Sequence, residues 1–139
     1  MIIGYTTGVF DLFHTGHLNI LRRAKEQCDF LIVGVSTDDL VESYKHKKPV
    51  VSFDDRIAIV SAIRYVDQAV PQKTLNKLEA WEKYHFNVMF HGDDWKGSAL
   101  FSEAEKELAK RGVKTVFFPY TKNVSSTILR EKFQESERS

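Results

Sequence analysis

The chain has 139 residues, a mass of 16.0 kDa and a formal net charge of +1 at pH 7, which predicts one domain with a core of its own. The near-neutral charge offers no basic field for nucleic acid or an anionic membrane, and no apolar run reaches the length that spans a bilayer. Cys28 is the only cysteine, which excludes an internal disulfide, and the N-terminus lacks the charged and apolar regions of a signal peptide. We therefore expect a cytoplasmic protein that binds neither nucleic acid nor a membrane.

Strand and helix signals alternate along the chain. Apolar runs rich in branched side chains predict strands at residues 2–6, 30–35, 66–70, 88–90 and 113–118. Apolar residues at helical spacing predict helices at residues 17–28, 52–63, 75–84, 102–111 and about 125–133. Ser52 with Asp55, and Ser102 with Glu105, have capping-box spacing, and Pro71 is expected to end the third strand.

This alternation predicts an α/β fold: a single Rossmann-like domain whose mainly parallel sheet of about five strands has helices on both faces. The domain is expected to cover residues 1–133, followed by a polar tail at 134–139. Ligands of such sheets bind beyond the carboxyl ends of the strands. Three unusual stretches, at residues 8–17, 91–95 and 120–127, each follow a predicted strand and so belong to that edge.

The first stretch, residues 8–17, reads G-V-F-D-L-F-H-T-G-H. His14 and His17 stand where a helix is expected to begin, so imidazoles and unpaired backbone N–H groups would meet there and favour an anion such as a polyphosphate. A His-x-x-His pair can also bind zinc, but no third ligand lies nearby at suitable spacing, so no protein-held metal site is expected. The spacing therefore favours a phosphate site.

The same stretch resembles the G-x-F-D-x-x-H-x-G-H signature of cytidylyltransferases, in the H-x-G-H nucleotidyltransferase superfamily, with every conserved position matched. Residues 92–95, G-D-D-W, and 64–67, R-Y-V-D, resemble motifs of bacterial glycerol-3-phosphate cytidylyltransferases. Residues 124–130, V-S-S-T-I-L-R, resemble the I-S-S-T-x-I-R motif near the end of many superfamily members. Taken alone, the second stretch could be a turn and the last a helix cap.

The resemblance implies transfer of CMP from CTP to a small phosphorylated alcohol such as glycerol-3-phosphate, with release of pyrophosphate and with Mg²⁺ on the triphosphate. It also implies a homodimer. The implied catalytic residues are His14, His17, Lys47 and Arg130. The implied nucleotide-binding residues are Gly8, Val9, Phe10, Asp11, Gly16, Arg64, Gly92, Asp94, Tyr120, Ser125, Ser126 and Thr127. The implied acceptor-binding residues are Lys45, Lys77 and Trp95.

The chain departs from the glycerol-3-phosphate pattern at Tyr120 and Asn123, where the family has Arg and Gly. Lys122 or Arg130 is expected to replace the missing arginine. Two alternatives stay open: an adenylyltransferase acting on a sugar phosphate, and a catalytically silent nucleotide-binding module. The G-D-D-W and R-Y-V-D motifs favour CTP over ATP, and the intact histidine pair favours catalysis over binding alone.

Overall fold

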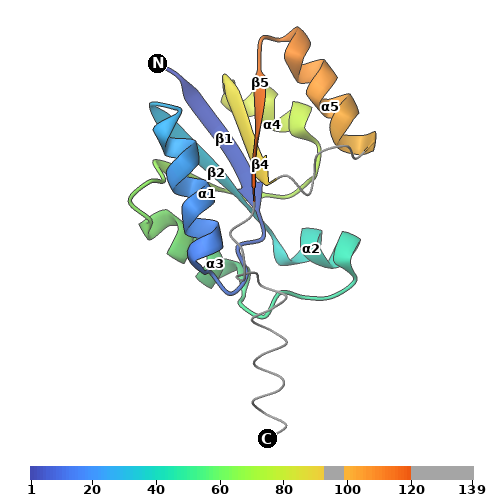
Figure 1. Ribbon diagram of the computed structural model, residues 1–139. Helices are drawn as coiled ribbons and strands as arrows, with labels where there is room; N and C mark the ends of the chain where they lie inside the picture. Colours follow the sequence, from blue (N-terminus) through green and yellow to red (C-terminus); the bar gives the residue numbers. More distant parts are fainter. Residues whose placement is uncertain (93–98, 120–139) are drawn as a thin grey trace, which may run out of the picture.

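A computed structural model describes residues 1–92 and 99–119, without the side chains of residues 99–101. Five parallel strands form one sheet in the order β3-β2-β1-β4-β5 (Figure 1). The strands are β1 (Ile3–Gly8), β2 (Phe30–Ser36), β3 (Gln68–Gln72), β4 (Val88–Gly92) and β5 (Lys114–Phe118). The helices of the described part are α1 (Thr15–Glu26), α2 (Asp38–Lys45), α3 (Phe53–Ala62), α4 (Lys77–Tyr84) and α5 (Ala99–Lys110).

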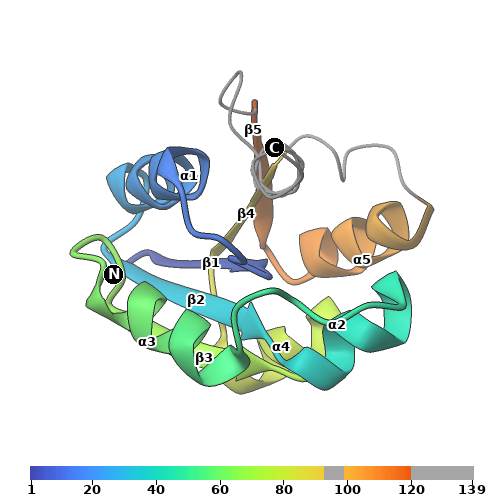
Figure 2. The same cartoon turned by 90° about the horizontal axis from the view of Figure 1, so that it is seen from below.

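Helices cover both faces of the sheet, which confirms the predicted fold. Figure 2 shows α1 and α3 on one face, with α4 and α5 on the other. The core beneath α1 and α3 includes the buried residues Leu21, Val33, Val60 and Phe90. The core beneath α4 and α5 includes the buried residues Tyr5, Ile32, Met89 and Leu108. Successive strand residues point to opposite faces, so a strand such as β2 serves both cores and reads as a continuous apolar run.

The strand order reverses between β1 and β4. From β1 the chain builds outward through β2 and β3, and then returns to place β4 and β5 on the other side of β1. The crevice beyond the carboxyl ends at such a reversal is the usual ligand site of an open α/β sheet. Here the loop after β1 and the end of β4 lie at that reversal, and the region between them is called the crevice below. In the described part of the chain, no helix is long and apolar enough to cross a membrane.

Helix α2 was not expected from the sequence. Thr37 caps it by accepting a hydrogen bond from the Leu40 amide (3.2 Å), and aspartates occupy its first turn, where the helix dipole favours them. Lys45 therefore lies in the last turn of a helix and not in a loop. Only Leu40 and Val41 of this helix are buried, so the segment has too short an apolar face to be recognised by periodicity.

Two expected boundaries and one expected helix cap were wrong. Strand β3 continues through Pro71, because an edge strand does not need every backbone donor. Helix α5 begins at Ala99, so Ser102 lies inside it and does not cap it. Helix α3 begins after Ser52 as predicted, but the Ser52 hydroxyl contacts the Asp55 carboxylate (3.3 Å) and caps no amide.

Candidate active site

The loop from β1 to α1 follows directly from the carboxyl end of the central strand. Phe10 and Leu12 have positive φ values of 55° and 51°, so the chain turns tightly there. The Phe10 ring folds back onto Gly8, where a Cβ atom would lie 3.0 Å from Phe10 Cε2. A side chain at position 8 would therefore require this buried ring to shift.

The two histidines are held in one orientation by backbone hydrogen bonds. The Gly16 amide donates to His14 Nδ1 (3.0 Å), and the His14 amide donates to His17 Nδ1 (3.2 Å). The rings stack with their centroids 4.0 Å apart. Because both Nδ1 atoms accept, each neutral ring carries its proton on Nε2. The start of α1 thus presents two Nε2–H donors side by side.

Both imidazoles are uncharged at neutral pH. Burial lowers the pKa of His14. The pKa of His17 is lowered to about 3 by burial and by the neighbouring His14, against the opposing effect of Asp11. Phe10 packs against the His17 ring at a centroid distance of 5.4 Å and contributes to its apolar surroundings. Neutral donors at a helix N-terminus can stabilise phosphate oxygens without a salt bridge in the resting site.

Asp11 anchors a neighbouring segment. Its side chain is buried, and its two oxygens accept hydrogen bonds from the amides of Val50 and Val51, both at 2.8 Å. These bonds attach the segment after α2, which contains Lys47, to the histidine loop. Asp11 is therefore placed to order the site and not to remove a proton.

Arg56, which the sequence analysis did not identify, connects the histidine loop to the segment after α2. It lies on α3 with a fully buried side chain and pairs with Asp38 at 2.6 Å. Its other hydrogen bonds go to the carbonyl oxygens of Val9 (2.7 Å), Ser36 (2.7 Å) and Val51 (2.9 Å). The available signal was an arginine four residues before the buried Val60, on the apolar stripe of the helix.

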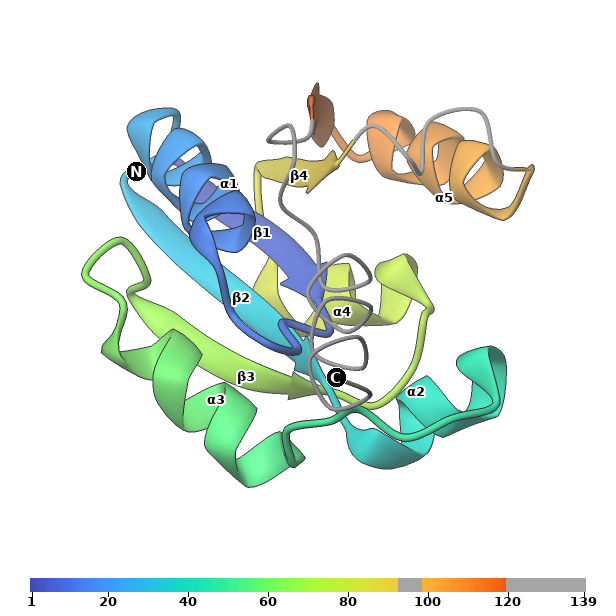
Figure 3. The same ribbon diagram turned by 60° about the horizontal axis from the view of Figure 1, so that its bottom comes forward.

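The basic residues after β2 lie at the carboxyl edge. Lys45 is the exposed last residue of α2, with its Nζ 5.9 Å from the centre of the Tyr44 ring. Lys47 is exposed in the segment that follows. Figure 3 shows this segment passing the ends of the strands on its way to α3. Both side chains are therefore on the solvent side of the crevice.

A second polar cluster lies at the same edge but on the opposite face of the sheet from the histidines. Lys77 is 7% exposed and its Nζ donates to Thr7 Oγ1 (2.7 Å). Burial lowers the pKa of Lys77 to about 7, and burial together with Lys77 lowers the pKa of the buried His91 well below its usual value. Thr7 and His91 follow Tyr5 and Met89 by two residues, so they point toward α4.

The structure does not bring Arg64 to these groups. It lies exposed on the connection from α3 to β3, at the amino edge of the sheet, and donates to the Tyr65 hydroxyl (2.9 Å). In the same motif, Asp67 accepts from the amide of Leu31 and from Lys25 Nζ, both at 2.7 Å. Within one chain, Arg64 therefore lies at the edge of the sheet opposite the histidine loop, and nucleotide binding by Arg64 stays a prediction.

The remaining predicted residues divide by position. Val9 contributes a carbonyl to Arg56, Gly16 a buried amide to His14, and Gly92 ends β4 at the crevice. The others lie outside the described residues: Asp94, Trp95, Tyr120, Ser125, Ser126, Thr127 and Arg130.

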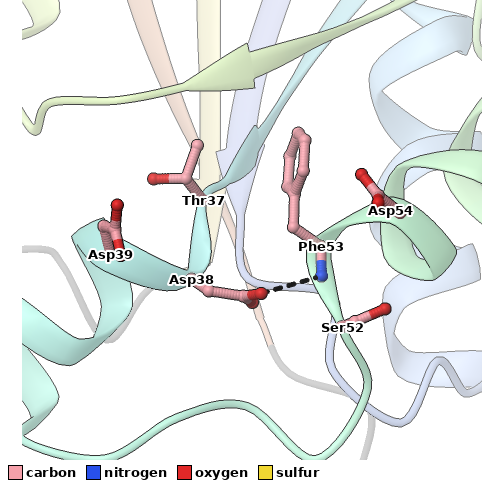
Figure 4. A pocket seen from close by; sticks show the side chains of 6 residues that line it. All are labelled: Thr37, Asp38, Asp39, Ser52, Phe53 and Asp54. Atoms are coloured by element: carbon pink, nitrogen blue, oxygen red, sulfur yellow. Dashed lines mark hydrogen bonds between the residues drawn. The ribbon is translucent and has the colours of Figure 1, made fainter.

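An open pocket of about 290 Å³ lies where α2 and α3 begin (Figure 4). It is lined by Thr37, Asp38, Asp39, Ser52, Phe53 and Asp54. Asp38 accepts a hydrogen bond from the Phe53 amide (3.2 Å), which joins the two helix starts. Three carboxylates make this pocket unsuitable for a triphosphate.

A parallel sheet with hydrogen-bond donors at a helix start beside its strand reversal is typical of nucleotide-binding α/β proteins. The family model described as cytidylyltransferase-like matches residues 5–132. The chain belongs to this family, as the sequence predicted.

Curated relatives and a solved structure agree with this assignment. Glycerol-3-phosphate cytidylyltransferase of Bacillus subtilis (strain 168) is 35% identical over 134 residues, covering 91% of this chain and 93% of its own. The enzyme of the same name from Staphylococcus aureus is 34% identical over 128 residues, covering 91% of each. The crystal structure of a lipopolysaccharide core biosynthesis protein from Thermoplasma volcanium superposes with a TM-score of 0.73 at 26% identity, covering 89% of this chain and 99% of that one.

Proposed function

We propose that this protein transfers CMP from CTP to a small phosphorylated alcohol, with glycerol-3-phosphate as the leading acceptor, and releases pyrophosphate. The observation that carries the proposal is the pair of neutral Nε2–H donors of His14 and His17 at the start of α1. Two relatives that span 91% of this chain bear the name glycerol-3-phosphate cytidylyltransferase. The name of these relatives supports the choice of substrates, and the two histidine donors support catalysis of phosphoryl transfer.

In this reaction, an oxygen of the acceptor's phosphate attacks the α-phosphorus of CTP. One P–O bond forms while the bond between the α-phosphorus and the pyrophosphate oxygen breaks in line with it. The acceptor phosphate already carries negative charge, so no general base is required. Catalysis then consists of positioning and charge stabilisation, with His14 and His17 donating to oxygens on which charge develops.

The charged side chains of the crevice have distinct proposed roles. Lys47 contacts the phosphates of CTP, and Lys45 and Lys77 contact the phosphate of the acceptor. Arg130 takes over part of the work of the arginine that Tyr120 replaces. We further propose that the enzyme is a cytoplasmic homodimer.

Magnesium is proposed to enter with the nucleotide. Asp11 is the carboxylate beside the histidines, and its oxygens hold backbone amides, so it serves as an anchor and not as a metal ligand. Mg²⁺ commonly keeps substrate phosphates and water among its ligands, which fits a site that supplies donors for phosphate oxygens. When bound to the triphosphate, the ion neutralises charge on the leaving pyrophosphate.

The experiment is to incubate the purified protein with Mg²⁺, one nucleotide and one acceptor, and to measure pyrophosphate. We expect release that requires both CTP and a phosphorylated alcohol, with glycerol-3-phosphate tested beside phosphorylated polyols and amino alcohols. Release with ATP and a sugar phosphate, but not with CTP, would identify an adenylyltransferase. Binding of CTP with no release across the panel would identify a silent binding module.

A further inference from the structure

Lys77 places an amine where two features, the helix dipole and burial, disfavour its positive charge. It is the first residue of α4, at the positive end of the helix dipole, and only 7% of it is exposed. Burial lowers the pKa of Lys77 to about 7, and Lys77 in turn helps to lower the pKa of the buried His91. A buried cation without an anionic partner is costly, so an anion arriving from outside would favour the charged form of this amine.

The described part of the chain gives this amine one hydrogen-bond partner, the Thr7 hydroxyl at 2.7 Å. An ammonium group has three donors, so a bond to Thr7 leaves two for a ligand. A hydroxyl can orient the ammonium group, but it cannot neutralise it. The contact therefore restricts where Nζ lies without occupying all its donors.

We infer that Thr7 is a positioning residue for the acceptor: its hydroxyl holds the Lys77 ammonium group against the end of β1, ready for the acceptor's phosphate. This inference rests on the proposed function and deepens it. Thr7 is the next-to-last residue of β1, and the chain runs from there through Gly8 into the loop that carries His14. The end of β1 thereby links the position of the Lys77 ammonium group, which would bind the acceptor, to the position of the histidine donors, which would bind CTP.

Thr7→Val tests the inference because it removes the hydroxyl and keeps the shape. A hydrogen bond to a charged group is stronger than one between neutral groups, so we expect the acceptor KM to rise about tenfold or more. The CTP KM and kcat should stay within about twofold of the parent values. Thr7→Ser restores the hydroxyl and should return the acceptor KM to near the parent value.

Thr115→Val on β5 is the matched control, because the Thr115 hydroxyl is buried without a hydrogen-bond partner in the described structure. It should leave all kinetic constants unchanged. If Thr7→Val is recovered unfolded, Thr7→Ala takes its place with the same expectation, and calorimetric binding of glycerol-3-phosphate provides a readout without turnover. The inference would be overturned if Thr7→Val left the acceptor KM unchanged or raised the KM of both substrates equally. It would also be overturned if Thr7→Ser failed to return the acceptor KM to near the parent value. The parent's own requirement for CTP and acceptor tests the proposed function separately.

Discussion

Each of the two histidines at the start of α1 carries its proton on Nε2. Because each Nδ1 accepts a backbone N–H, each Nε2–H remains available as a neutral donor. A neutral donor gains most when charge develops on its acceptor, which happens in the transition state and not in bound CTP. The pair is therefore expected to affect rate more than binding.

We predict that His17→Ala lowers kcat about 10²–10³-fold, as for one preorganised donor, while the Kd for CTP changes less than about threefold. Steady-state kinetics and calorimetry measure the two quantities. His14→Ala should behave alike, and the double variant should lose less than the product of the single losses if both rings serve one phosphate group. Weaker CTP binding at an unchanged kcat would show that His17 stabilises bound CTP and not the transition state.

Burial of His17 also links stability to pH. Its pKa is about 3 in the folded protein and 6.5 for a solvated imidazole, so between these values the unfolded chain binds a proton that the folded chain excludes. Stability from this group is complete above about pH 6.5 and is lost as the pH falls toward 3. His17→Gln removes the titration but keeps a side-chain acceptor for the helix cap. We predict that Tm falls less between pH 7 and pH 5 in His17→Gln than in the parent or in a variant of the exposed His46, and equal slopes would contradict this.

At the scale of elements, the site depends on β1, α2 and α3 being joined at one point. Arg56 on α3 reaches the carbonyls of Val9, Ser36 and Val51, and Asp11 holds the amide of that same Val51. The segment that carries Lys47 is thereby held at Val51 through both its amide, bonded to Asp11, and its carbonyl, bonded to Arg56. A displacement of α3 would move the segment and the histidine loop together.

We predict that Arg56→Lys destabilises the fold by about 1–3 kcal/mol and lowers kcat/KM for CTP about tenfold, because lysine keeps the charge but not the planar arrangement of donors. Thermal unfolding and kinetics in CTP provide the measurements. Arg64→Lys, at the exposed amino edge, is the matched control and should change neither. A stable Arg56→Lys with parental kinetics would show that the buried contacts are dispensable.

The elements differ in how well sequence could predict them. Strand β2 was predicted to within one residue, because a short continuous apolar run between polar segments is typical of a buried parallel strand. Helix α2 was missed because eight residues with two buried side chains carry little periodic signal. Strand β3 was placed two residues early because Pro71 breaks a central strand but not an edge strand, and edge position is a property of the whole sheet.

For the whole molecule, the sheet divides into a ligand edge and a structural edge. The histidine loop and the segment after α2 lie at the carboxyl ends of the strands, whereas Arg64 and Asp67 lie at the amino ends. Local sequence predicted the histidine site, because its motif is contiguous. It could not place Arg64 or find Arg56, because their positions depend on how distant strands and helices assemble.

We predict that CTP with Mg²⁺ slows hydrogen exchange in residues 9–17 and 46–51 and leaves residues 63–67 unchanged. Mass spectrometry of peptides from the free and nucleotide-bound protein measures this. Mg²⁺ alone is the control and should protect neither group. Strong protection of residues 63–67 by nucleotide would return Arg64 to the binding site, through a second copy of the chain or a change of shape.

Pro71 has a consequence beyond the boundary of β3. The outer strand of a sheet carries unpaired backbone groups that can recruit a strand from another molecule, the first step toward aggregation. Strand β3 has five residues, one of which cannot donate a hydrogen bond, and at the opposite margin β5 is equally short and is followed at once by the exposed Pro119. Both margins therefore resist continuation of the sheet into a neighbouring molecule. Two copies of this chain are accordingly expected to associate through helices and connecting loops, which leaves the ligand crevice of each copy on its own sheet.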